Sequence, residues 1–145
     1  MTPTLFGRIQ TRIFLLAVVG GVVTAWLTPL LPMGGPIGDR YRATFVVLAA
    51  VAVLGIGWEI IYHVLMQWRW EKDWPTLFGL LTGVTEGVLL WELVRVPIVP
   101  GLPGAVPAAP FVIDFAVIWL LVWLTGNGPM RVPFIRWRFK GGRLV

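Results

Sequence analysis

The chain has 145 residues, of which 57% are hydrophobic and only 13% are charged, and its mean hydropathy is +0.82. Water-soluble domains carry roughly 25% charged residues, and a soluble chain this short has too much surface to bury so much apolar area, so the composition predicts an integral membrane protein. The net charge is +5. The chain has no Cys, which excludes disulfides and thiolate metal sites. It has a single His, which excludes a multi-histidine metal or haem site within one chain.

The first apolar run extends from Ile13 to Leu31. It is longer than the ~7–15-residue apolar region of a signal peptide, and no small-residue cleavage pattern follows it. We therefore expect a first transmembrane helix over residues 13–31. Pro29 and Pro32 mark its end, because a helix rarely continues through proline.

Three further apolar runs follow the first. Residues 43–66 form a stretch of 24 residues, which exceeds the ~20 needed to cross a bilayer and predicts a tilted helix. Residues 75–96 form the third predicted span, which ends before Pro97. The fourth, residues 111–125, has only 15 residues, so a re-entrant segment is the alternative to a full crossing.

The sequence thus predicts an all-α integral membrane protein in which residues 1–128 form four transmembrane helices with short loops. Lys and Arg collect on the cytoplasmic side of membrane proteins. With a cytoplasmic N-terminus, three cations lie outside and nine lie inside, which predicts a multi-pass protein of the cell membrane with both termini in the cytoplasm. The nine are Arg8, Arg12, Arg69, Lys72, Arg131, Arg136, Arg138, Lys140 and Arg143.

The third span carries a stripe of glycines at Gly79, Gly83 and Gly87, spaced four residues apart. Such a stripe lets another helix approach closely, which is how helices associate in lipid. Gly55 of the second span lies at a similar depth. Because a short hinge joins these two helices, we expect the stripe to pack against the second helix. The pattern leaves open whether a copy of the chain or another protein also packs there.

Four acidic residues and one histidine lie inside the predicted spans. An ionised group near the bilayer centre costs at least ~2.5–3.5 kcal/mol, so each is a candidate functional residue. In one interpretation they only hold helices together, with Glu59 paired to His63. In the other they form a ladder for a proton or cation relay. The five are Glu59, His63, Glu86, Glu92 and Asp114.

The helix-holding interpretation makes specific pairing predictions. We expect Glu86 to bond to a backbone carbonyl or a nearby threonine, and to lie close to Glu59. Glu92 and Asp114 would pair with the arginines of the outer interface, which are Arg40, Arg42 and Arg95.

Enzymatic and metal-site signatures are absent from the sequence. There is no Ser, no Gly-x-Ser-x-Gly and no phosphate-binding glycine loop after a strand. Glu59, His63 and Glu86 are the ligand types of an open iron or zinc site, but their depths differ by about one helical turn. We therefore expect neither an enzyme nor a bound metal or cofactor.

Residues 129–145 form a basic, aromatic tail that we place at the cytoplasmic surface. Its apolar and basic residues alternate with period two, which predicts an extended strand. We expect it to anchor at anionic lipids; addition as a strand to a cytoplasmic partner is the alternative. Nucleic acid is not expected, because the patch is short and tethered to the membrane. The predicted contact residues are Arg136, Trp137, Arg138, Phe139 and Lys140.

These features together predict a small non-enzymatic integral membrane subunit or scaffold. It would assemble, as a homo-oligomer or within a larger membrane complex, through the glycine stripe and its intramembrane polar contacts. The alternative function is a proton or cation pathway that uses Glu59, His63 and Glu86.

Overall fold

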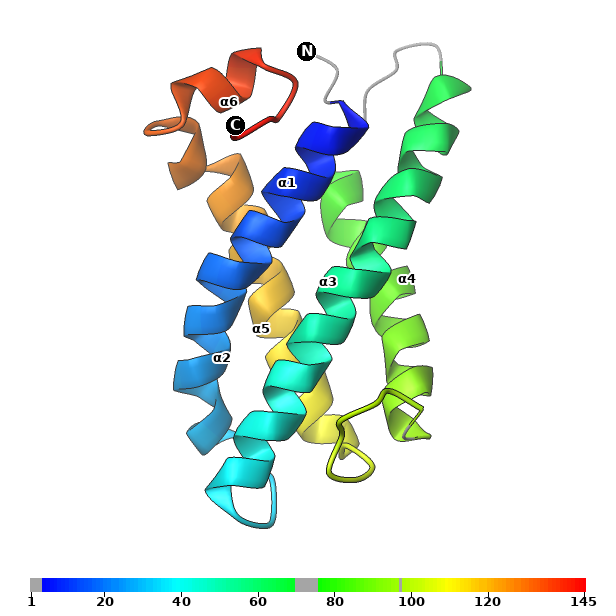
Figure 1. The fold of residues 1–145 in the computed structure, drawn as a ribbon, viewed down its shortest axis with the longest axis vertical. Helices are drawn as coiled ribbons and strands as arrows, with labels where there is room; N and C mark the ends of the chain where they lie inside the picture. Colours follow the sequence, from blue (N-terminus) through cyan, green and yellow to red (C-terminus); the bar gives the residue numbers. More distant parts are fainter. Residues whose placement is uncertain (1–3, 70–75, 97) are drawn as a thin grey trace.

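A computed structural model describes residues 4–69, 76–96 and 98–145, and all regular elements in these ranges are helical. The long helices run side by side along one long axis (Figure 1). In chain order they are α1 (Leu5–Leu15), the π-helical turn η1 (Leu16–Gly20), α2 (Gly21–Leu27), the 3₁₀ turn η2 (Thr28–Leu30), α3 (Ile37–Gln67), α4 (Thr76–Arg95), α5 (Ala108–Asn127), the 3₁₀ turn η3 (Pro129–Arg131) and α6 (Ile135–Phe139).

Four of these helical stretches are long and apolar enough to cross a membrane. They are Leu5–Leu30, Ile37–Gln67, Thr76–Arg95 and Ala108–Arg131. At 1.5 Å per residue, even 20 residues reach about 30 Å, the thickness of the hydrocarbon core. The predicted all-α, multi-pass architecture is confirmed, while the orientation of the termini stays a prediction.

The first spanning helix begins earlier than predicted, at Leu5 instead of Ile13. Thr4 caps it, because its side-chain oxygen accepts a hydrogen bond from the backbone N–H of Gly7 at 3.1 Å. The fourth also exceeds its predicted range, since Ala108–Asn127 replaces residues 111–125. Pro110 is tolerated there because the first turn of a helix needs no N–H donor.

The apolar core lies where the four stretches meet. It includes Leu16 of η1, Val47 and Val51 of α3, Leu90 of α4 and Ile118 of α5. Large apolar side chains also cover the outer faces of the helices, with Trp26, Val53 and Val84 among the most exposed. Such an outer surface matches a lipid environment, in which apolar side chains need no burial against protein.

The tail differs from the predicted strand, because its central part is the short helix α6. A strand needs a neighbour for its backbone groups, and the described residues contain no strand. A helical turn instead satisfies them locally, since the N–H of Lys140 donates to the carbonyl of Arg136 at 3.0 Å.

After α6 the chain folds back onto the start of α1 (Figure 1). Gly141 and Gly142 adopt φ values of +62° and +83°, a backbone region that favours glycine. The carbonyl of Gly141 accepts from the N–H of Thr4 at 2.8 Å, and the N–H of Leu144 donates to Oε1 of Gln10 at 3.0 Å. We call the end of the bundle where α1 starts and α6 lies the terminal end.

Candidate functional site

A cluster of ionic groups lies inside the bundle, in the half nearer the terminal end, and Arg12 of α1 is its centre. The Arg12 guanidinium binds Glu86 of α4 through two parallel contacts, one of them from Nη1 to Oε1 at 3.1 Å. The same Nη1 donates to Oε1 of Glu59 on α3 at 3.2 Å. One arginine therefore links three helices, in the bidentate geometry that suits a guanidinium and a carboxylate.

Arg8 completes the cluster one helical turn before Arg12. Its Nε donates to Oε2 of Glu59 at 2.6 Å, so both oxygens of Glu59 and both oxygens of Glu86 accept from arginine. Two cations balance two anions. This balance compensates the cost of placing each charge in a low-dielectric interior.

Gly55 of α3 makes room for this cluster. A Cβ atom at Gly55 would overlap Nε of Arg12 and come within 2.5 Å of its Cζ. Gly55 was predicted to let another helix backbone approach, but it instead leaves space for the Arg12 guanidinium to lie against α3. The close approach also leaves Nε of Arg12 buried without a hydrogen-bond partner among the described residues.

The structure brings Glu59 and Glu86 together, as predicted, but by a bridge that the sequence analysis missed. Arg12 was assigned to the cytoplasmic side, and Glu86 was expected to bond to a carbonyl or a threonine. A sequence signal did exist: Arg8 and Arg12 are four residues apart, so a helix that starts at Thr4 presents both on one face.

The remaining predicted polar residues lie outside the cluster. His63 does not pair with Glu59, and its buried Nδ1 has no hydrogen-bond partner in the described part of the chain. Glu92 pairs with Arg95 at 2.5 Å, as predicted, on the exposed surface. Asp114 is buried in α5, and its Oδ1 has no described partner, so the expected pairing with an outer arginine is not observed.

The glycine stripe of α4 packs against α5, which corrects the prediction that it packs against the second helix. A Cβ atom at Gly83 would overlap the indole of Trp119, and one at Gly87 would lie 2.8 Å from Cε1 of Phe115. Gly79 faces Trp123 at 3.7 Å. Large rings spaced four residues apart on α5 thus fill the depressions left by glycines spaced four residues apart on α4.

Two of these rings also bond to the backbone of α4. The indole N–H of Trp119 donates to the carbonyl of Leu80 at 3.1 Å, and that of Trp123 donates to the carbonyl of Thr76 at 3.0 Å. Trp119 further connects the stripe to the ionic cluster, because Cζ of Arg12 lies 5.4 Å from its ring centroid. Stripe and cluster are therefore parts of one packed unit.

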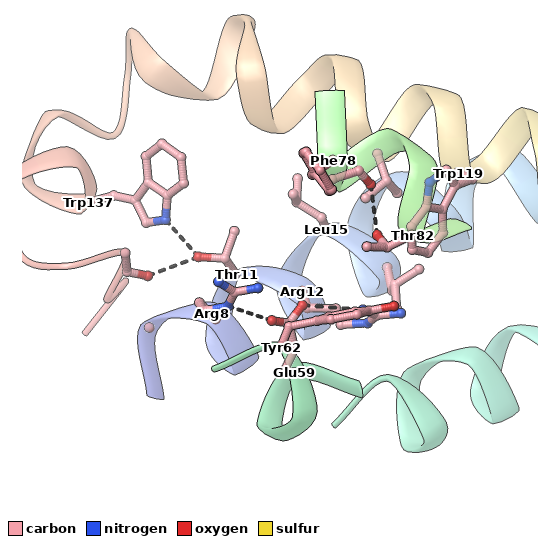
Figure 2. A pocket seen from close by; sticks show the side chains of 15 residues that line it. Arg8, Thr11, Arg12, Leu15, Glu59, Tyr62, Phe78, Thr82, Trp119 and Trp137 are labelled. Atoms are coloured by element: carbon pink, nitrogen blue, oxygen red, sulfur yellow. Dashed lines mark hydrogen bonds and ion pairs between the residues drawn. The ribbon is translucent and has the colours of Figure 1, made fainter. Parts of the chain in front are cut away.

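A cavity of about 310 Å³ adjoins this unit near the terminal end. Figure 2 shows the side chains around it, with Arg8, Thr11 and Arg12 contributed by α1, Tyr62 by α3, Phe78 by α4 and Trp119 by α5. The tail closes it on one side, because Trp137 and Gly142 also line it. Cavities of roughly 300–1,000 Å³ are the usual size for small-ligand sites.

The predicted contact residues of the tail divide into two groups. Trp137 turns inward, and its indole N–H donates to Oγ1 of Thr11 at 2.7 Å. Arg136, Phe139 and Lys140 are exposed, so they remain accessible to lipid or to a partner. The side chain of Arg138 lies outside the described residues.

A second hollow lies on the outside of the bundle, along α4 and α5. This groove has a volume of about 600 Å³ and is bordered by Gly83, Val84 and Gly87 of α4 and by Val112 and Ala116 of α5. We call it the α4–α5 groove. Its lining residues recur every three or four positions on both helices, so it follows the helix axes for about 16 Å.

Among the described residues, no group of three or more His, Asp or Glu side chains converges as metal ligands would. The ionic cluster has no carboxylate oxygen without an arginine donor. Its arrangement is suited to holding α1, α3 and α4 together and to forming one polar wall of the cavity.

Comparisons of the chain with protein-family models, with curated proteins and with solved structures gave no match.

Proposed function

We propose that the chain is a non-enzymatic integral membrane subunit that assembles through the α4–α5 groove, either with a second copy or with another membrane protein. The groove itself is the observation that carries this proposal. Val84, Val88 and Val112 stand exposed along it, while the small side chains of Ala108 and Ala116 leave it hollow. A surface of this length and shape complements the side of one transmembrane helix.

Membrane helices gain little from hydrophobic burial alone, because lipid is as apolar as leucine. Their association depends on close van der Waals packing, which small residues permit. The groove supplies such residues on α5, at Ala108 and Ala116. The acids of the ionic cluster contribute no such contact, because arginines of the same chain already bind all four of their carboxylate oxygens.

The alternative of a proton or cation pathway has less support from this geometry. A guanidinium remains positively charged in proteins, and Arg12 lies between Glu59 and Glu86. A fixed positive charge at this point opposes the passage of cations. His63, which the predicted pathway also uses, contacts neither acid through any described hydrogen bond, and its buried Nδ1 has no described partner.

The test is to fill the groove and follow assembly. Val84→Trp places a large side chain in the groove, and Val53→Trp is the matched control, because Val53 is similarly exposed (68% against 66%) on α3. Gly83 is a poor choice, since any side chain there would overlap Trp119 and disturb the monomer itself.

Assembly would be measured by crosslinking in native membranes and by native mass spectrometry of the extracted protein. We expect the wild type and Val53→Trp to keep the same copies or companions and Val84→Trp to lose them. A wild-type protein that is monomeric in both measurements would contradict the proposal. Equal assembly of the two variants would do the same.

A further inference from the structure

The cavity near the terminal end is a second candidate site, separate from the proposed assembly surface. It lies between α1 and α4 and is open beside Phe78 and Gly79, which are exposed, whereas the α4–α5 groove lies along the outer faces of α4 and α5. Its walls are mostly apolar, with contributions from Leu16, Phe78, Trp119 and Val122. It therefore has both the size and the character of a binding site.

Polar atoms in the wall are largely engaged by the protein. Oγ1 of Thr11 donates to the carbonyl of Gly142 at 2.9 Å and accepts from Trp137. Oγ1 of Thr82 donates to the carbonyl of Gly79 at 3.1 Å. The volume corresponds to roughly ten water molecules at ~30 Å³ each, and a buried water needs two to four polar partners. An apolar occupant suits these walls better than water does.

The charges around the cavity indicate which charge the polar head of a bound amphiphile would carry. Within the ionic cluster, Arg8 and Arg12 are balanced by Glu59 and Glu86. The tail that closes the cavity is not balanced, because residues 127–145 contain five cations and no acid. Each Lys or Arg near a membrane surface attracts anionic lipid by about 1 kcal/mol.

We propose that the cavity binds the apolar chain of an anionic amphiphile, with the anionic head beside Arg8 and the cations of the tail. An acidic phospholipid and a fatty carboxylate share this chemistry. The inward turn of Trp137 and the attachment of Gly141 and Gly142 to α1 make the tail the cover of the site. This role goes beyond the predicted anchoring of the tail and does not depend on the proposed assembly.

The first experiment measures ligand retention by native mass spectrometry on full-length protein in neutral detergent. The probes are dioleoyl phosphatidylglycerol, dioleoyl phosphatidylcholine and oleate. Val122→Trp fills the cavity, and Leu121→Trp is the matched control on the adjacent outward-facing position of α5. Arg136→Gln combined with Lys140→Gln removes two exposed cations of the tail.

We expect the wild type and Leu121→Trp to retain one anionic amphiphile and Val122→Trp to retain none. Affinity for the anionic probe should fall by about fivefold for each removed cation of the tail. Retention of phosphatidylglycerol alone would show that the bound head group is a phosphate, and retention of oleate alone would show that it is a carboxylate. Either result supports the site. Equal retention of phosphatidylcholine, or unchanged retention by Val122→Trp, would overturn the proposal.

A second measurement keeps the test decisive if Val122→Trp does not fold. Phosphatidylglycerol with a photoreactive acyl chain would be crosslinked to the wild-type protein, and the labelled peptides would be mapped. Label on Leu15, Leu16 or Val122 that excess unlabelled lipid removes supports the site. Label confined to outward-facing side chains would overturn it.

Discussion

Replacement of Arg12 by Met should destabilise the protein far more than the same replacement at Arg95. Both arginines pair with glutamate, but their surroundings differ. The side chains of Arg12, Glu59 and Glu86 are only 10%, 12% and 5% exposed, whereas those of Arg95 and Glu92 are 55% and 51% exposed. The two substitutions therefore compare a buried ion pair with a surface one in the same chain.

Removal of one partner from a buried ion pair costs about 3–5 kcal/mol, because the other charge stays behind uncompensated. Arg12→Met leaves Glu86 without its arginine and Glu59 with only Arg8. For Arg95→Met we expect about 0–1 kcal/mol, the usual value for exposed pairs. Typical domains have only about 5–15 kcal/mol of stability in total, so the first variant should lose a large part of it.

The free energy of unfolding would be measured by titrating sodium dodecyl sulfate into mixed micelles and following helix content by circular dichroism. We expect a much earlier transition for Arg12→Met than for Arg95→Met. If the two variants unfold at the same detergent fraction, the buried cluster does not stabilise the fold, and the reasoning is refuted.

Three glycine substitutions test close contacts, two of them in the same unfolding assay and the third by proteolysis. Gly55→Ala should lower the free energy of unfolding by about 1–3 kcal/mol because its methyl group would displace the Arg12 guanidinium. Gly57→Ala is the control: a Cβ atom there would have no neighbour within 4 Å, so the substitution should be neutral or slightly stabilising. Equal effects of the two substitutions would contradict the contact between Gly55 and Arg12. Gly83→Ala should cost a similar 1–3 kcal/mol, since it would overlap an indole of α5; a neutral result would argue against the α4–α5 contact. Gly7→Ala should detach the tail from α1, because a Cβ atom there would overlap the tail backbone. We expect faster tryptic cleavage of the tail in this variant. An unchanged cleavage rate would contradict the contact between the tail and α1.

The spanning helices could be predicted because their signal is local. Four apolar runs and their bounding prolines define them without reference to any other part of the chain. The helix ends were less accurate, since residues 5–12 and 37–42 contain charged side chains and yet belong to helices. Where these helices begin depends on capping and ion-pair contacts, which a hydropathy profile does not describe.

The ionic cluster could not be predicted from apolar runs, because its arginines lie before the first such run. A count of cations for topology treats Arg8 and Arg12 as surface charges. Only the packing of three helices shows that Glu59 and Glu86 need them. The partner of the glycine stripe was assigned wrongly for a related reason: chain order favoured α3, whereas the spacing of Phe115, Trp119 and Trp123 matches the stripe.

The tail illustrates the limit of periodicity over a short segment. Alternation of apolar and basic residues predicted a strand, but a strand requires a partner, and the segment forms a single helical turn and a return to α1. Gly141 and Gly142 were the available signal, because paired glycines commonly mark a change in chain direction.

The most direct test of the central feature, the link between Arg12 and Glu86, is a double-mutant cycle that combines Arg12→Met with Glu86→Leu. Unfolding free energies of the wild type, both single variants and the double variant would be measured by the same detergent titration. We predict that Glu86→Leu destabilises the wild type but stabilises Arg12→Met, because in the second case it removes a buried charge that has lost its partner. An equal cost of Glu86→Leu in both backgrounds would show that the two side chains are not coupled and would contradict the bridge between α1 and α4.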